Sequence, residues 1–405
     1  MIFVLTIWST IALASGQFTH VWITTHALEH LPEGDLRQLL TSPDSIEVLI
    51  NGSMFPDGGY AVNDDYGEIA HWEPLHNSYR DWIAEQFDPP YSDDAKKHIA
   101  FLMGMAAHGM ADQIFDALFI EAAKQHDADA DWTENYDMAT DVVFAGLVGT
   151  DAPPKAWVPN EVLVDLFGQH GHAVTSETLS DGQALLRLAI SWVSASGQNE
   201  SQWATYADQF PWSSAHINDS DIPGSPPCNS AVIAAYWQSV WRRLHGDSSL
   251  DPLVMTSFPH NGDYDHTTNA DLVASRISLV FSQGIITDSL TQTPIVISDS
   301  DGTPHPTTSW MYYGDQSNVM LIAPDESFAE DTQYQLRVGP GLQTIDGVTL
   351  DEEWSMMFST GPDPNNNTDA FTVDATEPCG GCSQHGTLAL WWLPWVAVRR
   401  RDDCI

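Results

Sequence analysis

The stretch Ala100–Leu118, AFLMGMAAHGMADQIFDAL, decides how the N-terminal half of this chain folds. It is strongly apolar, yet it carries His108, Asp112 and Asp116 at intervals of four residues. Residues four apart on an α-helix lie on one face, one turn above the other. Ionised carboxylates in an apolar setting are costly unless they are paired or bind a metal, and the chain has only 14 Lys and Arg to pair with. The stretch therefore predicts a buried helix that carries metal ligands.

Further candidate ligands lie on both sides of this helix. Upstream, His20 lies in FTHVWITTHALEHL, Asp57 in the turn GSMFPDGGY and His71 in AHWEPLHNSYRDW. Downstream, Asp137 and Asp141 stand four apart in ENYDMATDVVFAG. Imidazole nitrogens and carboxylate oxygens are the usual ligands of catalytic zinc. Each residue also has a structural alternative: a core histidine, ordinary turn chemistry for Asp57, or a solvated helix face for the downstream pair.

Length and charge limit the class of protein. A chain of 405 residues is longer than a typical single domain, so two or three units are expected. The 56 acidic residues give a formal net charge of -42. Such a chain repels phosphate backbones, so we expect no nucleic acid partner unless metals intervene. The same charge suits a salty medium, where self-repulsion is screened.

The pattern of apolar residues divides the chain into an all-α part and an all-β part. Helical periodicity dominates from about residue 17 to 247, with segments at Thr24–Leu40, Asn77–Gln86, Asp94–Gln125, Asp137–Val148, Leu179–Ser194 and Ser230–Leu244. From about Asp251 to Gly361, short alternating runs lie between turn residues, at Ile277–Phe281, Thr293–Ile297, Val319–Ile322, Gln333–Val338 and Trp354–Thr360. Strands at this spacing predict a β-sandwich of about 110 residues.

The two ends of the chain look like export and sorting segments. Met1–Gly16 is short and apolar and contains Ala12-Leu13-Ala14, the pattern of a cleaved signal peptide, although it lacks Lys and Arg near its start. At the other end, Cys379-Gly380-Gly381-Cys382 precedes the apolar run Thr387–Val398 and then Arg399–Arg401. This order resembles the C-terminal sorting tails of myxobacterial-type surface proteins. A zinc or redox pair is the alternative for the two cysteines. We therefore expect an exported protein that is retained at the cell surface or outer membrane, or secreted.

Five segments follow from these patterns. The predicted boundaries are a signal peptide (1–16), a metal-centred helical domain (17–247), an all-β domain (251–361), an acidic linker (362–378) and a sorting tail (379–405). The motifs SFPHNG at Ser257–Gly262 and DGVTL at Asp346–Leu350 make the β domain resemble bacterial Ig-like surface domains. Such domains are usually spacers or adhesive modules, and no catalytic set is evident in this one.

The helical part resembles a known enzyme family. Thr19–Ile23 (THVWI), Phe55–Asp57 (FPD), His71–Pro74 (HWEP) and Ala100–Asp112 (AFLMGMAAHGMAD) occur in the order and spacing of the zinc-dependent phospholipase C family. Within that family they look most like the catalytic domain of glycosylphosphatidylinositol-specific phospholipase D. The resemblance covers residues 19 to about 150 well and continues loosely to about 247. It implies a compact helical bundle with a trinuclear zinc centre.

The resemblance also assigns roles to individual residues. His20 matches the ligand near the mature N-terminus, Asp112 matches a carboxylate that bridges two ions, and a second zinc falls to Asp57, His71 and His108. The next family ligand is a histidine and falls on Asp116, while a following histidine–acid pair falls on Thr133 and Asp137. A pocket that gains carboxylates in place of histidines favours a harder cation such as Ca²⁺, Mg²⁺ or Mn²⁺. His126 is a possible substitute ligand.

The predicted function is that of an exported metal-dependent phosphodiesterase that acts on phospholipids. Two or three ions, mainly Zn²⁺, would bind phosphate oxygens and lower the pKa of a bound water towards ~7. Asp57 is the candidate general base. The partner is a phospholipid or membrane-surface substrate, and no obligate protein partner is inferred. Two alternatives stay open: a non-catalytic surface binding protein with a structural metal, and a zinc nuclease of the same fold. Which phosphoester bond and head group are used also stays open.

Overall fold

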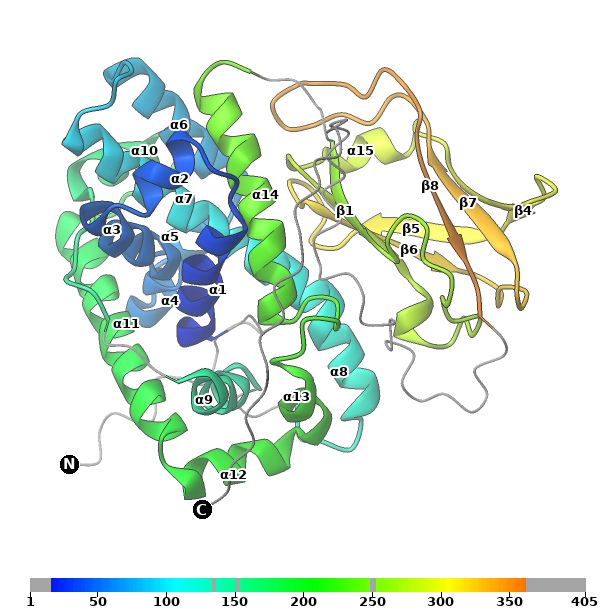
Figure 1. Cartoon of the computed structure of the whole chain (residues 1–405). Helices are drawn as coiled ribbons and strands as arrows, with labels where there is room; N and C mark the ends of the chain where they lie inside the picture. Colours follow the sequence, from blue (N-terminus) through cyan, green and yellow to red (C-terminus); the bar gives the residue numbers. More distant parts are fainter. Residues whose placement is uncertain (1–15, 133–135, 150–152, 248–252, 362–405) are drawn as a thin grey trace, which may run out of the picture.

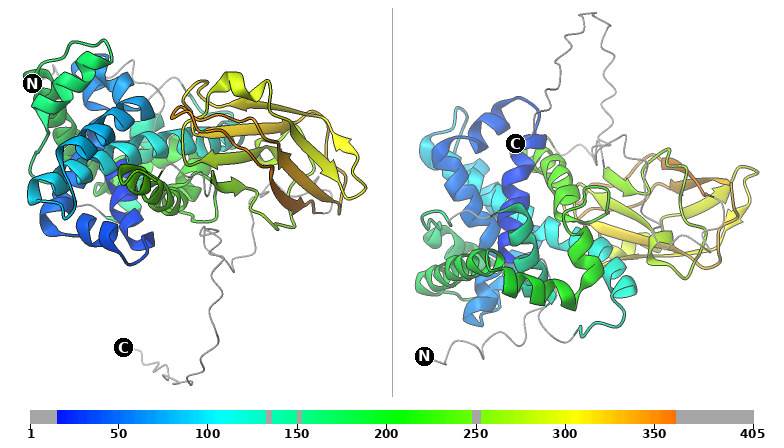
Figure 2. Two further views of the ribbon diagram at one scale, coloured as in Figure 1. Left: turned by 90° about the horizontal axis from the view of Figure 1, so that it is seen from above. Right: turned by 60° about the horizontal axis from the view of Figure 1, so that its bottom comes forward.

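The structure is a computed structural model that describes residues 16–132, 136–149, 153–247 and 253–361. The predicted linker and sorting tail, and the signal peptide up to residue 15, lie outside the described residues. The described chain forms a helical domain and a β-sandwich that lie side by side (Figure 1). Both views in Figure 2 place the sandwich at one end of the helical domain. None of the described helices has the length and apolarity needed to cross a membrane.

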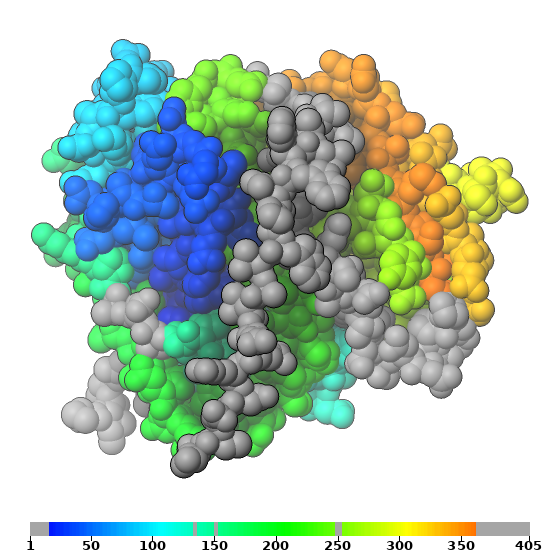
Figure 3. Space-filling view, viewed as in Figure 1, coloured from blue at the N-terminus to red at the C-terminus, as the bar shows by residue number. Residues whose placement is uncertain are grey.

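The helical domain contains the predicted helices and several that were not predicted. Its long helices are α1 (Gln17–His30), α3 (Pro43–Met54), α6 (Glu73–Gln86), α7 (Asp93–Ile114), α9 (Tyr136–Val148), α11 (Ser176–Gly197) and α14 (Pro226–Leu244). Shorter helices connect them: α2 (Asp35–Leu40), α4 (Gly58–Val62), α5 (Tyr66–Ala70), α8 (Glu121–His126), α10 (Asn160–Gln169), α12 (Glu200–Gln209) and α13 (Pro211–His216). The N-terminal helices and the sandwich occupy opposite ends of one face of the molecule (Figure 3).

Two predicted helices are interrupted in the structure. The segment predicted at Thr24–Leu40 divides into α1 and α2, because Pro32 and Gly34 lie where the chain turns. The segment predicted at Asp94–Gln125 begins as α7, where the Ser92 side chain accepts a hydrogen bond from the N–H of Ala95 as an N-cap. It then passes through a π-helix, η1 (Phe115–Ile120), before α8. The π turn changes the direction of the side chains that follow Ile114.

Helix α7 lies in the middle of the helical domain. Every residue from His98 to Ile114 on this helix is buried. It packs against α3, α6 and α14, so apolar side chains surround it on all sides, which explains why its sequence shows no polar face. The helix can therefore present His108 and Asp112 only to other buried groups.

The β domain is a sandwich of two antiparallel four-stranded sheets, as predicted. One sheet has the order β1-β2-β6-β5, with β1 (Val254–Phe258), β2 (Ile277–Phe281), β6 (Val319–Pro324) and β5 (Thr307–Met311). The other has the order β4-β3-β7-β8, with β4 (Pro304–His305), β3 (Ile295–Asp299), β7 (Gln333–Val338) and β8 (Trp354–Ser359). Two short helices, η2 (Val273–Ser275) and α15 (Thr287–Leu290), complete the described β domain. Its own core contains Leu279, Phe281, Leu336 and Phe358.

The sandwich is joined to the helical domain by a shared apolar core. Met255, Phe258, Val280, Val319 and Leu321 of the sheet β1-β2-β6-β5 belong to the same buried cluster as the residues of α7 and α14. A buried ion pair between Glu73 of α6 and Arg243 of α14 lies at the same junction. The Glu73 carboxylate also accepts the N–H of Gly284 from the sandwich. The two domains are therefore held in a fixed relation.

Candidate metal centre

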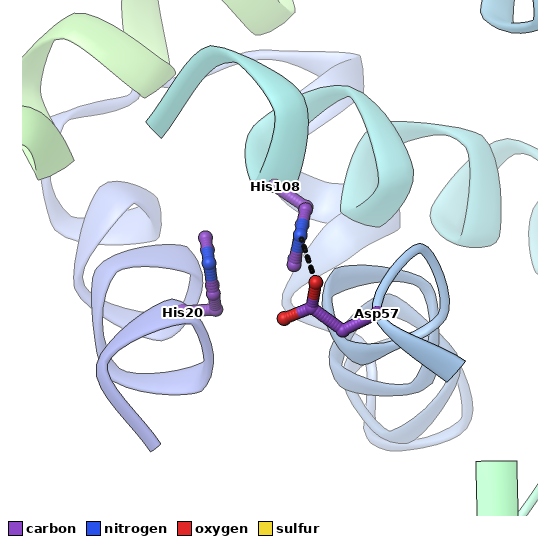
Figure 4. Close-up of side chains that lie close together, drawn as sticks. All are labelled: His20, Asp57 and His108. Carbon is purple, nitrogen blue, oxygen red and sulfur yellow. Dashed lines mark ion pairs between the residues drawn. The ribbon is translucent and has the colours of Figure 1, made fainter. Parts of the chain in front are cut away.

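The predicted ligands gather at one buried place beneath α1 and α7. His20 on α1, His108 on α7 and Asp57, which directly precedes α4, form one group of converging ligand atoms (Figure 4). The His20 and His108 rings stack, with centroids 3.7 Å apart. The Nε2 atom of His108 lies 3.7 Å from Oδ1 of Asp57. Three segments that are far apart in sequence thus contribute to one centre.

A second group shares His108 with the first. It consists of His71, His108 and Asp112. The two imidazole Nε2 atoms are 3.0 Å apart, and His71 Nε2 lies 3.3 Å from Oδ1 of Asp57. Asp112 faces all three histidines: its Oδ1 is 2.9 Å from His20 Nε2, and its Oδ2 is 3.4 Å from His71 and 3.3 Å from His108. The two oxygens of one carboxylate therefore point to different imidazoles, as a carboxylate that bridges two ions requires.

Backbone carbonyls set the orientation of two imidazoles. His108 Nδ1 lies 2.7 Å from the carbonyl oxygen of Ser53, and His71 Nδ1 lies 2.6 Å from that of Gly67. A carbonyl oxygen can only accept, so Nδ1 carries the proton in both rings. The Nε2 lone pairs are then directed into the centre. This is the usual arrangement of histidines that bind metal.

Two glycines of α7 allow the close packing that this arrangement needs. A Cβ on Gly104 would overlap the carbonyl oxygen of Leu49 and would lie 2.6 Å from the backbone nitrogen of Ser53. A Cβ on Gly109 would overlap the carbonyl oxygen of His71. Glycine at these positions brings α7 into backbone contact with α3 and with the His71 segment. The same close approach brings His108 next to the Ser53 carbonyl.

The electrostatics of the centre favour a bound cation. Burial lowers the pKa of His20, so its imidazole is neutral. Burial also lowers the pKa values of His71 and His108, but the neighbouring carboxylates of Asp57 and Asp112 together have the larger, opposite effect. The net result raises the two pKa values to about 10 and about 9. Burial opposes ionisation of Asp57, yet His108 and His71 hold its pKa well below its ordinary value. The carboxylates thus stay ionised and attract positive charge into a buried site.

Asp116 lies beside the two groups without belonging to either. It falls within the π-helix η1, so it does not continue the regular four-residue spacing of His108 and Asp112. Burial and the nearby Asp112 raise its pKa well above the usual range. Its Oδ2 accepts a hydrogen bond from the hydroxyl of Tyr313, which belongs to the sandwich. Its Oδ1 is buried and has no hydrogen-bond partner among the described residues.

The downstream carboxylates are placed differently from one another. Asp141 accepts hydrogen bonds from the N–H groups of Phe18 and Thr19 and from the Thr19 hydroxyl, at 2.7–3.0 Å. It thereby satisfies the N-terminus of α1 and positions His20 one residue further on. Asp137 lies half-buried in the first turn of α9, and His126 stacks on Trp212 with centroids 4.6 Å apart. Neither is part of the two ligand groups found among the described residues. Thr133 lies outside the described residues.

Comparison with known proteins agrees with this geometry. Residues 19–138 match the model of the zinc dependent phospholipase C family. Residues 249–360 match the model of a bacterial Ig-like domain. The match to the zinc dependent phospholipase C family contains five of the converging residues, His20, Asp57, His71, His108 and Asp112.

Part of the chain is also similar to curated proteins. The chain is 33% identical over 117 residues to phosphatidylinositol-glycan-specific phospholipase D of Bos taurus, which covers 26% of this chain and 14% of that protein. It is 31% identical over 147 residues to the protein of the same name from Rattus norvegicus, covering 34% of this chain and 17% of that protein. The chain therefore spans less than a fifth of the length of these relatives.

Solved structures give only weak overall similarity. The alpha-toxin of Clostridium perfringens aligns with a TM-score of 0.25 and 11% identity over 86% of this chain and 100% of that chain. The S-layer protein rSbsC(31-844) aligns with a TM-score of 0.21 and 10% identity over 81% of this chain and 46% of that chain. At these scores no conclusion about the arrangement of the chain follows from either.

The donor set at the centre fits the zinc of this phospholipase C family. Three imidazoles and two carboxylates converge, and nitrogen and carboxylate oxygen are ligands that zinc accepts. Two buried oxygens beside them, Oε1 of Gln17 and Oδ1 of Asp116, have no hydrogen-bond partner among the described residues. These oxygens are available to a cation, but other buried atoms among the described residues, such as those of Gln283, also lack a partner, so the fit rests on the donor set.

Sequence reasoning missed two residues that border the centre. Gln17 donates from Nε2 to Oδ2 of Asp57, and Tyr313 donates to Asp116 across 197 residues of sequence. Gln17 carried no signal beyond its position near His20. The Tyr312-Tyr313-Gly314-Asp315 turn offered a weak one, because adjacent aromatics at a hairpin turn are an unusual use of large side chains. The nearby aromatic residues Tyr66 and Phe115 are fully buried core residues.

Proposed function

We propose that this chain is an exported, surface-retained metal-dependent phosphodiesterase that hydrolyses phospholipids, with Zn²⁺ as its main cofactor. One observation carries the proposal. His20, Asp57, His71, His108 and Asp112 converge in a buried centre inside the segment that matches the zinc dependent phospholipase C family. The match to a bacterial Ig-like domain supports a place at the cell surface. The names of the curated relatives support a phospholipid substrate.

In this proposal the protein's own residues hold two or three ions. His20 is a neutral Nε2 donor, and His71 and His108 would become Nε2 donors once a cation displaces the proton that Asp57 and Asp112 favour on them. Asp57 and Asp112 would offer carboxylate oxygens. Asp112 would bridge, since its two oxygens face different imidazoles. Asp116 and Asp137 are candidates for a further, harder cation. When bound, zinc supplies Lewis acidity toward a phosphate oxygen and acidifies water.

Asp57 is the proposed general base. Its carboxylate is ionised, because the neighbouring histidines lower its pKa, so it has a lone pair to accept a proton, and the same lowering makes it a weak base. Its Oδ1 faces His71, and its Oδ2 accepts from Gln17. These contacts fix the plane of the carboxylate, which is what a base that acts on one defined water requires.

Two aromatic side chains border the centre and are proposed to receive the organic part of the substrate. The Tyr60 ring lies 5.3 Å from the His71 ring, and Trp72 follows His71 in sequence. One carboxylate holds both, because Glu68 accepts from the Tyr60 hydroxyl at 2.9 Å and from the Trp72 indole at 2.8 Å. Rings fixed in this way form a preorganised apolar wall.

The test is a comparison of Asp57→Asn with the native protein. Purified, zinc-loaded protein is assayed on phosphatidylcholine vesicles and on a phosphatidylinositol glycan, side by side. We expect hydrolysis of at least one substrate, and Asp57→Asn to lower the rate by about 100-fold or more, since it removes both a ligand and the base. The control is Asp44→Asn, an exposed carboxylate in the first turn of α3, which should retain the native rate. Absence of hydrolysis, or a native rate in Asp57→Asn, would contradict the proposal.

The number of bound ions separates the enzyme from the binding-protein alternative. Asp116 stands where the family has a histidine, and that departure favours the binding-protein alternative. Elemental analysis that finds two or three ions per chain supports the phosphodiesterase. A content of one ion or none supports a binding protein with a structural metal. The net charge of -42 disfavours a nuclease, and an assay on single-stranded DNA at varied salt tests it.

A further inference from the structure

We infer that the Ig-like domain is a working part of the metal centre, because its Tyr313 is a positioning residue that sets how Asp116 binds a cation. The inference rests on the metal centre of the proposed function and goes beyond it. The sequence suggested only a spacer or adhesive role for this domain. In the structure, this domain instead makes hydrogen bonds to the ligand-bearing helix and to the residue Asp116 that follows it.

The turn that carries Tyr313 reaches from the sandwich to the end of α7. It connects β5 and β6, whose strands pair from Thr307 with Pro324 to Met311 with Met320. The Tyr313 hydroxyl donates to Oδ2 of Asp116. The neighbouring Tyr312 hydroxyl lies 3.2 Å from the backbone oxygen of Asp116. Two adjacent tyrosines of one turn therefore contact the same residue, one at its side chain and one at its backbone.

A second set of bonds fixes the register of this turn on the helix. Oε1 of Gln113 accepts from the Ser317 hydroxyl at 2.9 Å and from the N–H of Asn318 at 2.6 Å. Gln113 follows Asp112 directly in sequence. The far end of the turn is thus bonded next to the proposed bridging carboxylate, while its near end is bonded at Asp116. The turn cannot shift along the helix without breaking both sets of bonds.

Tyr313 lies beside the centre and is partly exposed. The residue is 42% exposed, although its hydroxyl reaches a buried carboxylate. Its ring meets Trp72 edge to face, with centroids 5.3 Å apart, and Trp72 is adjacent to His71. The Ig-like domain therefore adds a side chain to the aromatic border formed by Tyr60 and Trp72.

The hydrogen bond determines what Asp116 can offer a cation. Tyr313 occupies one lone pair of Oδ2 and fixes the plane of the carboxylate, which leaves Oδ1 as the oxygen that is buried and has no hydrogen-bond partner among the described residues. Asp116 is thus held as a ligand through one oxygen. Hydrogen bonds to a ligating carboxylate fix its direction, and losing such a bond typically costs about 10- to 100-fold in metal affinity.

A purely structural role for the Tyr313 hydroxyl is the competing explanation. The domain junction has other anchors, namely the shared apolar core and the buried Glu73–Arg243 ion pair. Removing one hydroxyl should leave these anchors and the edge contact with Trp72 intact. A change confined to one bound ion would then report on Asp116 and not on domain packing.

The experiment measures metal binding by the full chain with Tyr313→Phe. Metal-free protein is titrated with Zn²⁺ against a chelator and, separately, with Co²⁺ while its visible absorption is recorded. We expect the affinity for one ion to fall about 10- to 100-fold, the remaining ions to bind as in the native protein, and the Co²⁺ spectrum of that site to change. Tyr312→Phe is the matched control. It should leave all affinities within about twofold of native, since the Tyr312 hydroxyl bonds to the backbone oxygen of Asp116 and to the Glu121 carboxylate and not to the Asp116 carboxylate.

A double-mutant cycle tests whether Tyr313 acts through Asp116. In an Asp116→Asn background, Tyr313→Phe should have no further effect on any affinity. Native metal affinities in Tyr313→Phe would overturn the inference, as would a uniform loss of all ions with a lowered melting temperature. These results are independent of catalysis. If Tyr313→Phe alters metal binding but the native protein shows no phosphodiesterase activity, only the proposed function is contradicted. If the native protein hydrolyses a phospholipid but Tyr313→Phe binds metal as the native protein does, only this inference is contradicted.

Discussion

Histidines in this molecule are buried in two chemically opposite ways. His71 and His108 face Asp57 and Asp112, and their pKa values rise to about 10 and about 9 despite burial. His266 in the Ig-like domain has no such carboxylate. Its Nε2 lies 3.1 Å from the carbonyl oxygen of Ser275, its ring packs against Phe328 and Phe358, and burial lowers its pKa to about 4. The same residue type thus lies in the proposed metal centre of one domain and in the core of the other.

The environment of His266 predicts an acid-sensitive contribution to stability. Its folded-state pKa lies below the ordinary value of 6.5, so the unfolded chain binds a proton more readily. The stabilisation is present above pH 6.5 and is lost as the pH falls towards 4, amounting to about 2–3 kcal/mol by pH 4.5. His266→Gln keeps a donor for the Ser275 carbonyl but does not titrate. Urea unfolding at a series of pH values should show that the free energy of unfolding falls less for His266→Gln than for the native protein, by that amount. The same pH dependence in both proteins would contradict the role given to His266.

Single residues also show what the sequence could and could not reveal. His20, Asp57, His71, His108 and Asp112 were predicted as ligands because their motifs are local and metal-ligand chemistry restricts the residue types. Their roles as ligands stay predictions, although the structure brings them together. The bond from Tyr313 to Asp116 could not be predicted, because it joins positions 197 residues apart that belong to different domains.

Helices were predictable where their apolar pattern was uninterrupted. The long helix α7 and the helices α9 and α14 follow from periodicity, whereas α3 was missed because Asn51, Gly52 and Ser53 weaken the pattern. The π-helix η1 was not foreseeable, since it depends on packing around Asp116. Among the strands, β1, β4 and β5 were missed, and all three are at sheet edges. Edge strands carry shorter apolar runs than the central strands β2, β3, β6 and β7, which were all predicted.

The crossing of α3 and α7 is the element whose geometry matters most for the centre. Gly104→Ala places a methyl group against the backbone of Leu49 and Ser53, neither of which can move without shifting a helix. We expect a loss of about 3 kcal/mol or more in the free energy of unfolding. We also expect weaker zinc binding, because the Ser53 carbonyl orients His108. Thermal or urea unfolding and a zinc titration measure the two effects.

The matched control for this substitution is Gly168→Ala in α10. A Cβ there meets nothing within 4 Å, and the residue is exposed. Because alanine is the better helix former, this variant should be neutral or stabilised by up to about 1 kcal/mol, with native zinc binding. If Gly104→Ala unfolded with the same free energy as Gly168→Ala, the close crossing would not be a requirement of the fold.

At the scale of the whole molecule, the division into an α and a β domain was visible in the sequence, but their union was not. Periodicity of 3.6 and of 2 residues distinguishes the two parts without reference to contacts between them. The interface is made by residues that look like ordinary core or surface positions, such as Val280 and Glu73. Only the folded chain shows that they meet. The signal peptide, linker and sorting tail stay predictions, since they lie almost wholly outside the described residues.

The interface predicts that the two domains unfold together. Glu73 is buried, pairs with Arg243 and accepts from Gly284 and Asn318 of the Ig-like domain, so it ties α6 and α14 to the sandwich. Calorimetry of the native protein should show one transition.

Glu73→Gln leaves Arg243 with a weaker partner in Asp346, 3.4 Å away, and should lower the free energy of unfolding by about 3–5 kcal/mol. The control is Glu33→Gln, whose carboxylate is 85% exposed and pairs with Arg37 at 3.7 Å, and it should change stability by less than about 1 kcal/mol. Two separate transitions in the native protein would show that the sandwich unfolds independently of the helical domain and would contradict the prediction that the two domains unfold together.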